Sequence, residues 1–233
     1  MKKFLGSWTI LEILLLVFSE IAVVACFIFA QEKNVLSFAV SVVGVLATWV
    51  LAKGLTIAPI VNMCYGILYS ILAILQHYYG EAIVYLAFVI PTIIFSIIAW
   101  LKHRNNQNNV VVQVNKIKGK EYALLGVAVV FALVGFYFLL KSLNTSELIL
   151  STFSLVSSAV AWYLMFRRSA FYAIGFMVNE TILIILWSMA VVNSGVGYLP
   201  MVICSCVFLI SEIYGFIHWK ITEKKQQAEV EIS

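Results

Sequence analysis

The sequence predicts an all-α integral membrane protein with eight transmembrane helices. An N-terminal helix would precede two parallel repeats of three helices, joined by one linker helix. The first observation is composition: of the 233 residues, 63% are apolar and 11% are charged, whereas a soluble domain carries about 25% charged residues. The second is a series of eight apolar windows, and the third is that the second half of the chain repeats the first.

The eight windows give the helices in order along the chain. They are 9–30, 35–52, 57–75, 82–101, 121–140, 147–166, 171–192 and 198–219. Each is close to the ~20 residues that a helix needs to cross a hydrocarbon core of ~30 Å. They lack the alternating hydrophobicity of barrel strands, so helices are expected throughout.

Basic residues set the expected orientation. With Met1 in the cytoplasm, 13 of the 15 Lys and Arg residues fall inside, and Lys33 and Lys141 remain outside. This bias predicts that both termini are cytoplasmic. It also accounts for the net charge of +4 without a nucleic-acid partner.

The first window has an alternative interpretation as a signal peptide. Lys2 and Lys3 precede an apolar run, and Val23–Cys26 loosely resembles a lipoprotein cleavage box. Glu12 and Glu20 lie inside the run, however, which favours a retained helix. The four cysteines, all within predicted helices, are interpreted as small apolar residues rather than disulfides or ligands. They are Cys26, Cys64, Cys204 and Cys206.

The two halves are similar in order. Val42–Gly54 resembles Leu155–Arg168, and each segment is followed by a helix with an Asn in its first third, Asn62 and Asn179. An odd-numbered repeat would be inverted unless an extra helix restored its direction. The helix at 121–140 does so, which makes the repeats parallel.

These features divide the chain into six expected parts, of which the basic loop is interpreted as a solvated linker. They are the N-terminal helix and loop (1–34), the first repeat (35–102), the basic cytoplasmic loop (103–120), the linker helix (121–146), the second repeat (147–220) and a cytoplasmic tail (221–233).

Polar and aromatic residues form stripes on three of the predicted helices. A lipid tail offers them no partner, so the stripes should face a protein interior or a water-filled cavity. Interhelical hydrogen bonding is the alternative role, at ~0.6 kcal/mol per bond. A carboxylate at mid-membrane costs more, roughly 2.5–3.5 kcal/mol. The candidate substrate-binding residues are Asn62, Tyr65, Tyr69, Phe176, Asn179, Glu180, Trp187 and Tyr214, and their neighbours on the stripes include Gln76, Tyr172, Leu183, Ser211, Glu212 and His218.

This combination of aromatic, amide and carboxylate groups suits one kind of ligand. Aromatic faces stack flat rings and attract cations, while amides and carboxylates bind polar edges. We therefore expect a flat, polar vitamin or nucleoside, either neutral or cationic, rather than a metal ion or a lipid. No cofactor is expected.

Several anchors resemble the PnuC family of bacterial vitamin transporters, small relatives of the SWEET-type sugar transporters. The resemblance covers roughly residues 35–222 and includes Trp49, Asn62, Trp100 and the Arg167-Arg168 corner. It implies a SWEET-like 3+1+3 fold in a bacterial cell membrane, a site at the midplane and a homo-oligomer, specifically a trimer. It further implies facilitated diffusion of a nicotinamide riboside-type substrate, trapped inside by phosphorylation.

The chain also departs from this family. Members that carry nicotinamide riboside usually have W-x-x-W-x-x-x-N after the basic corner, where this chain has Ala173, Phe176 and Glu180, with Asn179 one position early. A carboxylate beside aromatics would also suit cationic thiamine. Thiamine and deoxynucleosides therefore remain alternative substrates.

Two other functional classes require different features of the sequence. An enzyme would need a nucleophile–base set or a metal cluster, and the three histidines, His77, His103 and His218, lie near different helix ends. No H-E-x-x-H motif or P-loop occurs, so neither an enzyme nor direct ATP coupling is predicted. A proton symporter that uses Glu180 or Glu212 remains an alternative.

Overall fold

The computed structural model describes residues 8–30, 33–78, 82–83, 85–103, 111–145 and 147–232. Its elements are α2 (Ile10–Phe29), α3 (Val35–Ala52), α4 (Ala58–Leu75), the π-helix η1 (Tyr85–Val89), α6 (Ile90–Lys102), α7 (Gly119–Ser142), α8 (Leu148–Phe166), α9 (Tyr172–Ser194), the short 3-10 helix η2 (Val196–Tyr198) and α10 (Leu199–Ile232). Eight helical segments within these ranges are long and apolar enough to cross a membrane. The predicted fold class is confirmed.

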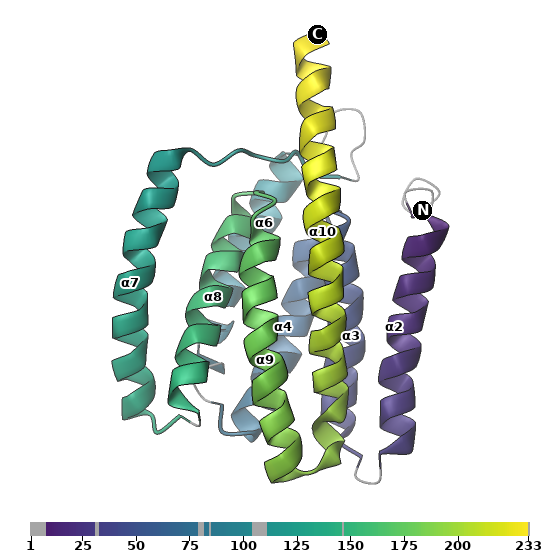
Figure 1. The fold of residues 1–233 in the computed structure, drawn as a ribbon, viewed down its shortest axis with the longest axis vertical. Helices are drawn as coiled ribbons and strands as arrows, with labels where there is room; N and C mark the ends of the chain where they lie inside the picture. Colours follow the sequence, from purple (N-terminus) through teal and green to yellow (C-terminus); the bar gives the residue numbers. More distant parts are fainter. Residues whose placement is uncertain are drawn as a thin grey trace.

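Six helices form a closed ring. α3 packs on α4, α4 on α6, α6 on α8, α8 on α9, α9 on α10, and α10 returns to α3. α2 lies outside the ring against α3 and α10, and α7 lies outside it against α8 (Figure 1). The chain enters and leaves the bundle at the same end, which we call the termini end.

The two repeats share the same corner between their first and second helices. α3 is capped by Lys53 and α8 by Arg167, and each cap is followed by a residue in the left-handed region, Gly54 (φ 63°) and Arg168 (φ 56°). Each next helix begins at the same distance from its corner, at Ala58 and Tyr172. Counted from these starts, Asn62 occupies the position of Phe176, so the two Asn residues of the repeats lie at different depths.

The third helices of the repeats make matching contacts across the ring. Trp100 Nε1 of α6 donates to the carbonyl of Met165 at 3.2 Å, and Trp219 Nε1 of α10 donates to the carbonyl of Leu51 at 3.3 Å. The two indoles lie 5.7 Å apart. Each repeat therefore fastens the corner of the other, which supports the parallel arrangement.

Two predicted segments differ from the structure. The window 82–101 is divided into η1 and α6, because Pro91 lacks the N–H that a continuous α-helix would use. The tail predicted from 221 onward instead continues α10 to Ile232. Glu and Lys residues with high helix propensity favour this extension.

Part of the basic loop also differs from the solvated linker that the sequence suggested. Residues 104–110 lie outside the described residues, but Val112 is only 1% exposed. Its N–H donates to the Gly54 carbonyl at 3.1 Å, and the N–H of Asn115 donates to the Arg168 carbonyl at 2.9 Å. Gln226 of the α10 extension bonds the same segment at Val112 and Val114. This part of the loop is therefore a strap over both corners.

Candidate functional site

Two aromatic clusters lie inside the ring at different depths. The tyrosine cluster, toward the end opposite the termini, consists of Tyr65, Tyr69, Tyr78, Tyr85 and Trp187. The tryptophan cluster, toward the termini end, consists of Trp100, Trp162, Tyr172, Phe176 and Trp219. All ten side chains are buried.

The tyrosine cluster joins three helical elements. Tyr69 of α4 lies 4.6 Å from Tyr85 of η1 and 6.1 Å from Trp187 of α9, measured between ring centroids. Tyr65 contacts Phe208 of α10 at 5.5 Å. Gly44 of α3 makes this contact possible, because a Cβ there would lie 2.9 Å from both rings. The aromatic faces thus meet where α3, α4 and α10 converge.

A polar layer separates the two clusters. Asn179 is 2% exposed and its Oδ1 accepts hydrogen bonds from Ser154 at 3.0 Å and Ser157 at 3.3 Å, which fixes the amide against α8. Glu180 is 4% exposed and lies within electrostatic range of Tyr65 and Glu212. A buried carboxylate needs donors, a proton or a cation beside it. The layer is suited to hold a polar or positively charged group.

Buried hydrogen-bonding atoms without partners also occur elsewhere in the bundle. Within the described residues these atoms include the indole nitrogens of Trp49, Trp162 and Trp187, Tyr172 Oη and Glu212 Oε2. Leaving such a group unsatisfied costs about 1–3 kcal/mol. They come from α3, α8, α9 and α10, so they are not confined to one helix contact.

The structure brings together most, but not all, of the sequence-predicted site residues. Tyr65, Tyr69 and Trp187 form the tyrosine cluster, with Glu180 nearby. Asn62 instead uses its amide nitrogen on backbone carbonyls, at 2.9 Å to Ala58 and 3.4 Å to Ala47. The hydrogen bond to Ala47 joins α4 to α3, which is the alternative role of interhelical hydrogen bonding.

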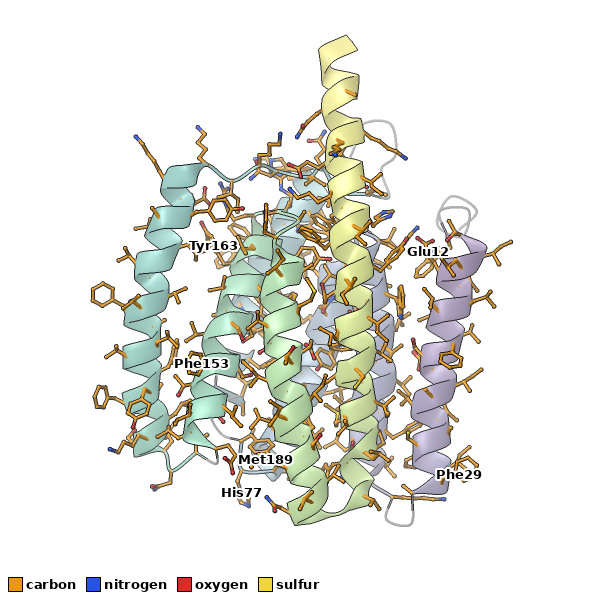
Figure 2. The ribbon with its side chains drawn as sticks, in the orientation of Figure 1. Glu12, Phe29, His77, Phe153, Tyr163 and Met189 are labelled. Carbon is orange, nitrogen blue, oxygen red and sulfur yellow. The ribbon has the colours of Figure 1, made fainter. Side chains whose placement is uncertain are left out.

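Two further predicted residues lie apart from that cluster. Phe176 packs in the tryptophan cluster, 5.2 Å from Trp162. Tyr214 points toward the outer helix α2, where its hydroxyl donates to Glu12, and its ring stacks on His218. Glu12 also pairs with Lys53 at 2.8 Å. Figure 2 shows Glu12 on α2 near the termini end of the bundle.

Sequence reasoning missed several residues of this interior. Tyr85 lies in the predicted window 82–101 but was not assigned to a polar stripe, and Trp162 appeared only within the repeated segment Leu155–Arg168. The start of α2 could have been predicted, because Thr9 and Glu12 have the spacing of a capping box, which the structure contains. Nothing in the local sequence pairs Glu12 with Lys53.

Comparison with known proteins supports a single family. Residues 34–221 match the nicotinamide mononucleotide transporter family. The chain is 26% identical over 236 residues to the nicotinamide riboside transporter PnuC of Neisseria mucosa, covering 98% of this chain and 88% of that protein. It is also similar to the crystal structure of the vitamin B3 transporter PnuC, with a TM-score of 0.84, 22% identity and 96% of each chain covered. At that identity the structural likeness concerns the fold.

Proposed function

The chain belongs to the nicotinamide mononucleotide transporter family, and on this premise we propose that it is a membrane transporter that carries nicotinamide riboside by facilitated diffusion. Both relatives described above are named as transporters, not enzymes. The observation that carries the substrate proposal is the acidic polar layer between two aromatic clusters. A pyridinium ring is flat and positively charged, so aromatic faces and carboxylates both stabilise it.

Binding by purified protein tests the substrate. We expect calorimetry to show micromolar affinity for nicotinamide riboside and much weaker affinity for riboflavin and deoxynucleosides. Thiamine is the second candidate, because Glu180 replaces the Asn usual in this family and thiamine is also a flat cation. Tighter binding of thiamine than of nicotinamide riboside would overturn the first choice.

Transport in liposomes tests the mechanism. A uniporter equilibrates its substrate and accumulates it only when an internal kinase phosphorylates it. We therefore expect labelled nicotinamide riboside to stop at equal concentrations inside and outside, and to accumulate when a riboside kinase and ATP are enclosed. Concentrative uptake driven by a proton or sodium gradient alone would contradict facilitated diffusion.

We further propose that the termini end faces the cytoplasm of a bacterium. The 13-to-2 bias of basic residues supports this orientation. A cysteine introduced at Asn193 should react with an impermeant thiol reagent from outside, and one at Lys118 should not. The reverse pattern would invert the topology. The proposed trimer can be tested by mass measurement in detergent.

A further inference from the structure

A second carboxylate lies buried in the ring, toward the termini end from Glu180. Glu212 of α10 is 3% exposed. Its Oε1 accepts one long hydrogen bond from Thr48 at 3.4 Å, and Oε2 has no hydrogen-bond partner within the described residues. The Thr48 hydroxyl also hydrogen-bonds the Ser211 hydroxyl at 2.5 Å, so its hydrogen bond to Glu212 is weak.

A buried phenol packs against α10 at Gly215, one helical turn after this carboxylate. Tyr172 at the start of α9 is fully buried, and its hydroxyl also has no partner in the part of the chain that the structure describes. A Cβ at Gly215, three residues after Glu212, would lie 3.2 Å from Tyr172 Oη. The phenol and the carboxylate lie within electrostatic range of each other.

Packing explains neither group. The ring of Tyr172 packs on Trp219 at 5.0 Å and on Phe176 at 6.0 Å, measured between ring centroids. A phenylalanine would make the same contacts. The hydroxyl adds only an unsatisfied polar atom, and so does Glu212 Oε2. Leaving such groups unsatisfied destabilises the fold, more so when they are charged, and that cost is recovered when a ligand pairs with them.

Charge indicates the kind of ligand. The buried charged side chains that the structure describes are Glu12, Lys53, Glu180, Glu212 and Glu223. Lys53, the base of this set, is at the end of α3 and pairs with Glu12. Glu212 therefore faces an interior whose described bases are engaged elsewhere, and an organic cation would complement it.

We propose that Glu212 and Tyr172 form a substrate station between Glu180 and the termini end, at which Glu212 pairs with the positive charge of the substrate and Tyr172 donates a hydrogen bond to one of its neutral oxygens. The station rests on the proposed function, since it assigns a charge requirement to the same transport path. Glu212 is then a specificity-determining residue, selecting cationic over neutral ring systems.

Nicotinamide riboside and its reduced dihydropyridine form make a matched pair of probes. They share the ribose and the carboxamide, but the reduced form is uncharged. Binding of each to the purified full chain is measured by calorimetry. The wild type should prefer the cation, and Glu212→Gln should reduce that preference about tenfold, or about 1.4 kcal/mol. Tyr172→Phe should weaken both ligands about equally, by about threefold.

Glu223→Gln is the matched control. Glu223 is a buried carboxylate on the same helix that pairs with Lys220 at 2.9 Å, and its loss should leave the preference unchanged. Thermal unfolding establishes that each variant is folded. Tyr172→Phe keeps the packing, so it tests the station even if Glu212→Gln is unstable.

The results separate this station from the proposed function. If the wild type binds neither form, the proposed function fails. If it binds both and Glu212→Gln retains the full preference for the cation, the charge role is overturned. Unchanged binding in Tyr172→Phe overturns the hydrogen bond. If the wild type shows gradient-driven uptake and Glu212→Gln loses it with its cation preference intact, Glu212 is a proton carrier, which overturns both facilitated diffusion and the station.

Discussion

Gly44 is the position where the tyrosine cluster leaves least room, and Gly44→Ala measures how tightly it is built. The new Cβ would lie 2.9 Å from a carbon of Tyr65, 2.9 Å from a carbon of Phe208 and 3.1 Å from Cys204 Sγ. Carbon atoms pack best at about 3.5–4.0 Å. The rings of Tyr65 and Phe208 must therefore move away as rigid bodies by about 0.6–1 Å, because an aromatic ring cannot bend.

The expected loss of stability follows from two opposing effects. Overpacking costs about 1–3 kcal/mol, and replacing a helical Gly by Ala returns up to about 1 kcal/mol. We expect a net loss of about 1–2 kcal/mol, which lowers the melting temperature by about 2–4 °C per kcal/mol for a chain of this size. Because Tyr65 moves, substrate affinity should fall at least about threefold.

Two glycines on the outer helix α7 provide controls. Nothing lies within 4 Å of a Cβ at Gly126 or Gly135, so alanine there should be neutral or stabilising. Phe208→Leu shortens the side chain that meets Gly44→Ala and should recover part of the loss in the double variant. A Gly44→Ala protein as stable as the α7 controls, with wild-type binding, would refute the close convergence of α3, α4 and α10.

The remaining predictions concern the polar interior and the frame around it. Glu180→Gln should fold normally and bind substrate about tenfold more weakly, and a loss of melting temperature with normal binding would make Glu180 structural. Asn62→Ala should lower stability through its backbone contacts to α3 and weaken binding only modestly; a larger loss of affinity than in Glu180→Gln would place Asn62 on the substrate. Glu12→Gln removes the carboxylate that pairs with buried Lys53 and should cost about 3–5 kcal/mol, whereas adding Lys53→Met should restore most of it in chemical unfolding. Trp219→Phe removes one bond between the repeats and should cost about 0.5–1.5 kcal/mol without changing substrate preference; an altered preference would place Trp219 in the site.

The sequence predicted the helices well because a membrane imposes a strong local rule. Apolar windows of sufficient length had to be helices, so the predicted bounds of α3 and α4 agree with the structure within one residue. The π-helix η1 and the strap at Val112 were not predicted. Pro91 interrupts the α-helix at η1, and the strap depends on backbone partners in distant segments, at Gly54 and Arg168. Hydropathy carries neither kind of information.

The candidate site was harder to predict than the fold. Helical periodicity places Tyr65 and Tyr69 on one face, and the structure packs them together with Trp187. The direction of Tyr214 could not be predicted, because it depends on Glu12, 202 residues away in the sequence. The order of the repeats suggested that Asn62 and Asn179 are equivalent. Counted from the starts of their helices, however, the two residues lie one turn apart in depth.

Two parts of the bundle differ in symmetry, and the difference bears on transport. We call the six helices of the ring the frame, and the side chains that face its interior the lining. The frame is nearly symmetric, since Trp100 and Trp219 each bind the first helix of the opposite repeat at almost the same distance. The lining is not, because the corner register puts Gly66 where the other repeat has Glu180. A symmetric frame allows the two repeats to rock against each other about one axis, as alternating access requires. An asymmetric lining suits a substrate whose ring and sugar differ, because acidic and aromatic groups then meet different parts of it. We therefore expect the symmetric frame to allow the movement and the asymmetric lining to determine which substrate binds.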